Sequence, residues 1–133
     1  MTDTAATELI HAQVPLCATL GITADTFRPD EVVLSLDWAP TLCTGNDVLH
    51  GGIVMALADS SGAVCAFLNL PEGAGGTATI ESKTNFFAAT RSGTVKAHSH
   101  PLHIGKRVIV VETEIRGDDG KLAAKTIQSQ AVL

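Results

Sequence analysis

The chain has few basic residues and few cysteines, and both shortages narrow what it can be. Its 133 residues include nine Lys and Arg against 14 Asp and Glu, giving a formal net charge of −5. An acidic chain has little general affinity for nucleic acid or anionic membranes, so neither is expected as a partner. The three cysteines, Cys17, Cys43 and Cys65, are an odd number without a CxxC pair. This count argues against a disulfide framework or a structural zinc site and favours free thiols in the cytoplasm.

Other features are also missing. The N-terminal segment MTDTAATELIHAQ has neither the basic n-region nor the apolar h-region of a secretory signal. No apolar run without polar interruption is long enough to span a bilayer. Three histidines cluster in HSHPLH (98–103), and His98 and His100 would share one face of a strand. Lys96 shares that face and no acid lies nearby in the sequence, so no metal site is expected. There is no tyrosine, and the few aromatic residues include Phe67, Phe86 and Phe87 as candidates to line a pocket.

What is present indicates one ordered domain covering residues 1–133. Hydrophobic residues make up 45% of the chain and charged residues 17%, a balance typical of a globular protein with a core. Residues 4–19 predict a short helix with a break near Pro15 and an end at Gly21. Residues 31–38 alternate between apolar and polar side chains, which predicts a half-buried strand.

The rest of the chain divides into one apolar helix and a set of strands. Residues 53–68 predict a helix that is apolar on nearly every side, apart from Asp59. After residue 76, four strand-like stretches are separated by the turn signals TRSG, HIGK and GDDG. Short connections of this kind favour antiparallel hairpins. The fold class is therefore α+β, with a long central helix wrapped by a curved antiparallel sheet of five to six strands.

The apolar helix also predicts an oligomer. A helix without a polar face has nothing to present to water, so a second copy of the chain should cover it. We expect a homodimer at least, or a homotetramer built from two dimers.

The segment LHGGIVMALAD (49–59) carries a family resemblance. Together with the strands that follow, it resembles the hotdog-fold acyl-CoA thioesterases, in particular the phenylacetate-pathway-type branch. The resemblance covers residues from about 14 to 133, and its anchor is HGG with an acid nine positions after the histidine. PLHIGK (101–106) and the closing AVL are similar to dihydroxynaphthoyl-CoA and aryl-carrier-protein thioesterases of the same fold. The resemblance implies a hotdog fold and an acyl-CoA substrate, with no cofactor.

Thioester hydrolysis needs donors for the developing oxyanion and a group that attacks the carbonyl carbon or activates water. The first N–H groups of a helix lack partners within the helix, and Gly51 and Gly52 let a substrate approach them. The resemblance implies that the Gly51 N–H is the oxyanion donor. Asp59 is the expected nucleophile or general base, since an unpaired carboxylate is costly to bury. For His50, a general-base role and a structural role in the loop stay open.

Helix geometry adds a constraint. Gly51 and Asp59 are eight residues apart, which is roughly 12 Å along a helix. One thioester carbonyl cannot contact both residues of the same chain. Two helices running antiparallel across a two-fold axis would bring Gly51 of one chain to Asp59 of the other, with two sites per dimer.

The remaining candidates are polarising and phosphate-binding residues. Relatives usually carry Asn or Gln six residues before the histidine, where this chain has Thr44. Either the loop brings Asn46 to the thioester or Thr44 supplies a hydroxyl. Thr79 falls where related enzymes carry a Ser or Thr that holds water or the carboxylate, although a plain strand threonine is the alternative. Arg91, Lys106 and Arg107 lie on or beside turns that resemble the nucleotide-contacting region of the family, and solvated turn charges are the alternative.

Two other functions compete with hydrolysis. A non-catalytic acyl-CoA-binding sensor module could be built on the same fold, although residues 1–20 are too short for a DNA-binding segment and are not basic. A dehydratase acting on 3-hydroxyacyl thioesters would need a histidine paired with the acid, which the HGG-acid spacing fits less well.

Overall fold

The computed structural model describes all 133 residues, beginning with two short helices. α1 (Thr4–Gln13) starts at the N-cap Asp3, whose carboxylate accepts a hydrogen bond from the Ala6 N–H at 3.0 Å. α2 (Pro15–Leu20) begins at its proline and ends at Gly21, which has a φ of 71° in the left-handed region. The predicted helix over residues 4–19, with its break near Pro15, is confirmed.

The strands form one six-stranded sheet in the order β1-β2-β4-β5-β6-β3, and every neighbouring pair is antiparallel. This confirms the α+β class and the predicted sheet. The strands are β1 (Thr23–Phe27), β2 (Val32–Asp37), β3 (Thr77–Phe86), β4 (Thr94–Ile104), β5 (Val108–Arg116) and β6 (Leu122–Val132).

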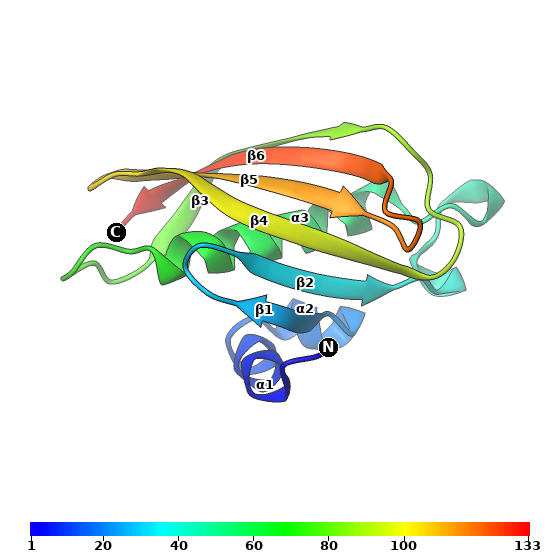
Figure 1. The fold of residues 1–133 in the computed structure, drawn as a ribbon, viewed down its shortest axis with the longest axis horizontal. Coiled ribbons are helices and arrows are strands. Elements are labelled where there is room, and N and C mark those ends of the chain that lie inside the picture. The colour runs from blue at the N-terminus through cyan, green and yellow to red at the C-terminus, as the bar shows by residue number, and fades with distance from the viewer.

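Two details of the strands differ from the prediction. β1 was not predicted, because TADTF is short and polar and buries only Ala24 fully. The TRSG segment (90–93) does not close a hairpin, since β3 pairs with β6 whereas β4 pairs with β2 and β5. The connection after β3 instead crosses the end of the sheet (Figure 1). HIGK and GDDG do form the predicted hairpin turns between β4 and β5 and between β5 and β6.

The long helix α3 (Gly51–Leu68) lies across the inner face of the sheet (Figure 1). By length and composition alone it could cross a membrane, but one side of it packs against the strands. The residues buried on that side recur at helical spacing and are mostly small, which brings the helix close to the sheet. They are Val54, Leu57, Ala58, Ser61, Gly62, Cys65 and Ala66.

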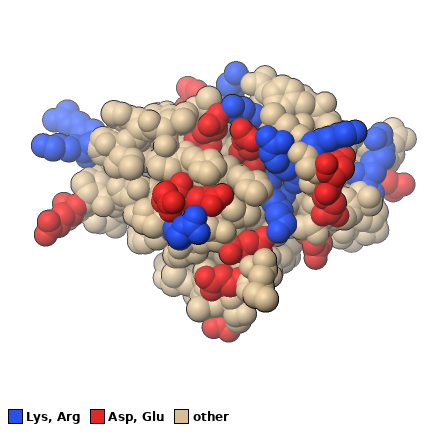
Figure 2. All heavy atoms as spheres, in the orientation of Figure 1, with Lys and Arg blue, Asp and Glu red and all other residues tan.

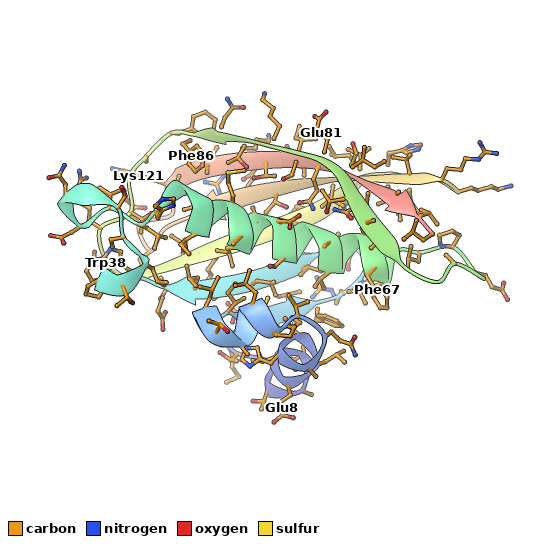
Figure 3. The ribbon with its side chains drawn as sticks, turned by 180° about the vertical axis from the view of Figure 1, so that it is seen from behind. Glu8, Trp38, Phe67, Glu81, Phe86 and Lys121 are labelled. Atoms are coloured by element: carbon orange, nitrogen blue, oxygen red, sulfur yellow. The ribbon has the colours of Figure 1, made fainter.

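The other side of α3 is not covered within one chain. Figure 3 shows the helix in front of the central strands of the sheet, with most of its outer face uncovered. Met55 is 37% exposed and Phe67 58% exposed there, and Asp59 is exposed between them. An uncovered apolar face is what the predicted oligomer requires of a single chain, and the oligomer itself stays a prediction. Asp59 lies on the uncovered side.

Hydroxyl groups join α3 to the middle of the sheet. Ser99 of β4 donates a hydrogen bond to Ser61 of α3 at 2.7 Å and is paired with Thr113 of β5 at 2.7 Å. All three side chains are fully buried. Because these buried hydroxyls satisfy one another, they fix the helix against the sheet without leaving unpaired polar atoms.

β3 forms one edge of the sheet and contains a β-bulge. Thr79 pairs with Gln130 of β6, but the next pair is Glu81 with Ser129, so Ile80 has no partner. The extra residue breaks the alternation of side chains along the strand. As a result, Thr79 is aimed at α3 while Ile80 is 62% exposed.

Candidate active site

The start of α3 presents one backbone amide without a hydrogen-bond partner. The Gly52 N–H donates to Nδ1 of His50 at 2.8 Å, and the N–H groups of Ile53 and Val54 donate to the His50 carbonyl. The Gly51 N–H has no acceptor, and it lies at the positive end of the helix dipole. This amide is therefore available to a negatively charged oxygen, as predicted for an oxyanion donor.

His50 is the N-cap of α3. Its Nδ1 accepts the Gly52 hydrogen bond, so the neutral ring carries its proton on Nε2. Its backbone N–H donates to the Leu42 carbonyl at 2.9 Å, which anchors the preceding loop to the helix. The geometry favours the structural role of the two alternatives, because the Nδ1 lone pair is already engaged.

Asp59 is held through one of its two carboxylate oxygens. Oδ1 accepts hydrogen bonds from the hydroxyl of Thr79 at 3.3 Å and from the amide of Gln128 at 3.2 Å. Neither contact involves Oδ2. The structure thus brings Thr79 to the acid, as the resemblance implies, and leaves one oxygen open to a substrate or a water molecule.

The contacts of Gln128 and Gln130 with this site were not predicted. Both are on β6 and only 1% exposed, and Gln130 donates to the hydroxyl of Thr79 at 2.7 Å. The sequence pattern that could have indicated them is the alternation along β6, in which Thr126, Gln128 and Gln130 share one face and Ile127 lies on the other. Alternation normally places the apolar side inward. Here Ile127 is 44% exposed and the polar face points at the helix.

An apolar cavity of about 540 Å³ adjoins Asp59. It lies between α1, the second half of α3 and the start of β3, and its walls are mainly hydrophobic. The lining residues include Leu9, Val14, Phe27, Asp59, Ser60, Ala63, Val64 and Phe67. Of the predicted pocket aromatics, Phe67 lines this cavity. Phe86 instead lies over the helix start, where a Cβ on Gly51 would approach its ring to 3.3 Å, and Phe87 is 59% exposed.

Thr44 and Asn46 lie in the loop before α3, and both are exposed. Backbone pairing in an isolated antiparallel β-bridge between Cys43 and Leu49 closes the loop. Asn46, within the loop, adopts a left-handed conformation with a φ of 62°. The indole N–H of Trp38 donates to the Asp47 carbonyl at 3.0 Å. The loop is thus anchored on both sides of Asn46. The prediction that either Thr44 or Asn46 replaces the usual amide keeps both alternatives.

The three candidate phosphate-binding residues do not form one cluster within a chain. Lys106 and Arg107 are in the turn between β4 and β5, whereas Arg91 follows β3, and these segments lie at opposite ends of the molecule (Figure 1). Figure 2 shows an isolated basic group at the end of that turn and further basic groups toward the other end. Arg91 lines a polar hollow of about 240 Å³ with Lys121, Asp118 and Asp119.

Cys17 and Cys65 are not suited to act as the nucleophile. All three cysteines are free, and Cys17 and Cys65 are fully buried. Burial raises the pKa of Cys65 to about 11 and also raises the pKa of Cys17. Both thiols are therefore protonated at neutral pH, and Asp59 is the better placed reactive group.

The fold and this site define a class of protein. A long helix on the inner face of a curved antiparallel sheet is the hotdog architecture. The family model of the thioesterase superfamily matches residues 46–124, which include the helix start, Asp59 and Thr79. The chain belongs to the thioesterase superfamily, and the activity of its class is thioester hydrolysis.

Individual relatives agree with this assignment. A protein named as an esterase in Saccharolobus solfataricus is 40% identical over 86% of this chain and 80% of its own length. The 1,4-dihydroxy-2-naphthoyl-CoA hydrolase of Escherichia coli is 34% identical over 65% of this chain and 62% of its own. The crystal structure of a Haemophilus influenzae thioesterase superposes with a TM-score of 0.87 at 26% identity, covering 96% of this chain and 87% of that one.

Proposed function

We propose that this protein hydrolyses acyl-CoA thioesters to a free acid and CoA. Two observations on α3 together carry the proposal. The Gly51 N–H has no hydrogen-bond acceptor, and the Asp59 carboxylate accepts hydrogen bonds only through Oδ1, which leaves Oδ2 free. The N–H donates to the thioester oxygen as negative charge develops on it. Asp59 either attacks the carbonyl carbon, forming an anhydride that water then opens, or takes a proton from the attacking water. In both routes the CoA sulfur leaves with its electron pair and is protonated.

We further propose that the working unit is a homodimer, alone or paired into a tetramer. Gly51 and Asp59 lie roughly 12 Å apart along α3, too far to share one carbonyl. The uncovered face of α3 is apolar, with Met55 exposed between these two residues and Phe67 exposed beyond Asp59. An antiparallel second copy of α3 would cover this face and bring Asp59 of the partner subunit to Gly51. A cytoplasmic location, where acyl-CoA esters and reduced thiols coexist, stays a prediction.

The acyl group that fits the structure best is apolar. The cavity beside Asp59 is lined mostly by hydrophobic side chains and has a volume of about 540 Å³. Its position next to the carboxylate suits the acyl chain rather than the charged nucleotide. Both small aromatic and medium-length aliphatic groups satisfy these conditions. One relative is named for an aromatic substrate, a dihydroxynaphthoyl-CoA, which supports including aromatic esters in any test.

The direct test is the release of free CoA thiol from a panel of esters. The panel should contain phenylacetyl-, hydroxybenzoyl- and dihydroxynaphthoyl-CoA together with fatty acyl-CoA esters of several lengths. We expect thiol release from at least one apolar ester, detected with a thiol reagent, and none from CoA esters of small charged acids, which the apolar cavity disfavours. Tight binding of an ester without thiol release would instead support the sensor function.

The basic turn residues should act on binding rather than on chemistry. Changing both Lys106 and Arg107 to alanine should raise KM for CoA esters more than it lowers kcat, because phosphate contacts stabilise the ground state and the transition state alike. The measurement compares a CoA ester with the corresponding pantetheine ester, which lacks the nucleotide. Changing Lys83, exposed on β3, to alanine is the matched control. An equal loss with the pantetheine ester would contradict the assignment to phosphate binding.

A further inference from the structure

Two glutamines are buried where a sheet normally presents apolar side chains to a helix. Gln128 and Gln130 alternate along β6 and are each only 1% exposed. A buried amide is costly unless its donors and acceptors find partners. The partners that these amides have in this structure lead in both cases to Asp59.

Gln130 reaches Asp59 through Thr79. The amide of Gln130 donates to the Thr79 hydroxyl at 2.7 Å, and its oxygen accepts from the Thr77 hydroxyl at 3.0 Å. Since the Thr79 oxygen accepts from Gln130, its single proton is available for the carboxylate at 3.3 Å. The order of donors is therefore fixed, from amide to hydroxyl to carboxylate.

Gln128 reaches Asp59 directly. Its nitrogen donates to Oδ1 at 3.2 Å and lies 3.5 Å from the backbone carbonyl of the same residue. Its own oxygen is buried without any hydrogen-bond partner. Turning the amide over would place this oxygen against the carboxylate, and two acceptors repel each other. The amide is therefore oriented toward Asp59, although its oxygen lacks a partner.

Gly62 makes room for this amide. It lies within α3, where glycine is about 1 kcal/mol less favourable than alanine. A Cβ at this position would fall 2.0 Å from the Gln128 oxygen. Gly62 is one turn beyond Asp59 on the helix, so the space that it leaves is the space that the amide fills.

From these contacts we infer that Gln128, seated over Gly62, is a positioning residue for Asp59. Together with the Gln130–Thr79 pair it anchors Oδ1 from two directions and leaves Oδ2 as the reactive oxygen. All of these groups come from one chain, so the carboxylate is oriented before a partner subunit contributes Gly51. This inference rests on the proposed function, since it assigns Gln128 a role only through Asp59.

The test is a double-mutant cycle on kcat. Gln128→Met keeps the length of the side chain but removes its donor, and we expect kcat to fall about 10- to 100-fold, the effect of losing a hydrogen bond to a charged group. KM should change less than about two-fold, because the residue does not touch substrate. In the Asp59→Asn background, Gln128→Met should lower the residual kcat less than about two-fold, because its effect passes through the acid.

Two further variants complete the experiment. Thr126→Val is the matched control, since Thr126 is buried on the same face of β6 and pairs with Thr84 at 2.7 Å but does not contact Asp59. It should leave kcat within about two-fold of the wild type. Gly62→Ala provides a second route if Gln128→Met does not fold, because the added methyl displaces the amide while alanine favours the helix. It should lower kcat without lowering the melting temperature.

The outcomes are distinct. If Gln128→Met leaves kcat unchanged, or lowers it equally with and without Asp59, the positioning role is wrong while the proposed function stands. If Gln128→Met does not fold, an unchanged kcat in Gly62→Ala overturns the role in the same way. If Asp59→Asn itself keeps wild-type kcat, the proposed function fails and takes this inference with it.

Discussion

Replacing Asp59 with asparagine should lower kcat at least about 100-fold and leave KM nearly unchanged. The change removes the nucleophile or general base, a contribution of about 10²- to 10⁴-fold in enzymes that use such a group. It should not disturb the fold, because asparagine retains an oxygen that can accept the hydrogen bonds from Thr79 and Gln128. Steady-state kinetics on the best ester of the panel, with a thermal melt for each variant, gives the measurement.

A matched control exists on β2. Asp37 is also exposed, and its carboxylate also accepts a hydrogen bond from a threonine, Thr94, at 2.7 Å. Asp37→Asn removes the same charge from the same kind of contact, away from α3. We expect its kcat to stay within about two-fold of the wild type. Equal losses in the two variants would show that net charge, not the position of Asp59, determines the rate.

The second large effect is recovery of activity by mixing two inactive variants. Gly51→Leu places a side chain where a Cβ alone approaches the Phe86 ring to 3.3 Å, and it obstructs the path to the Gly51 N–H. Loss of one oxyanion donor costs about 10²- to 10³-fold in kcat, so this variant should be nearly inactive. Asp59→Asn should be nearly inactive for a different reason.

When subunits of the two variants exchange, each mixed dimer should contain one site with both defects and one site with neither. A fully randomised equal mixture should therefore recover about a quarter of wild-type activity, because half of the dimers are mixed and half of their sites are intact. Mass spectrometry confirms the exchange, and light scattering confirms the dimer. Exchange without recovery would mean that Gly51 and Asp59 serve a site within one chain, and a fully active monomer would have the same meaning.

The sequence predicted those parts of the fold that depend on local patterns. The apolar run at 53–68, the break at Pro15 and the turns HIGK and GDDG each lie where the structure has a helix, a helix boundary or a hairpin. Each of these signals is decided within a few residues by side-chain spacing or by turn-forming residues. The HGG segment likewise located the open amide at the start of α3.

Features that depend on contacts between distant segments were not predicted. The TRSG segment looks like the other turns, and only the pairing of β3 with β6 shows that it crosses the sheet. Alternation along β6 identifies two faces but not which of them points at the helix. The sequence therefore does not predict that Gln128 and Gln130 are buried beside Asp59. The exposure of Asp59 also depends on where the sheet ends, which the helix sequence alone does not reveal.

The bulge at Ile80 has a consequence for how relatives should be compared. Strict alternation counted back from Ser82 would point Thr79 away from the helix. The extra residue reverses this alternation, so Thr79 faces Asp59. A relative that lacks the extra residue would present its hydroxyl one position further along, although its β3 sequence would look similar. An alignment that puts its gap elsewhere in the strand would match Thr79 to an outward-facing residue. The pairing with Gln130 of β6, rather than a fixed count along β3 from Ser82, identifies the hydroxyl that serves the acid.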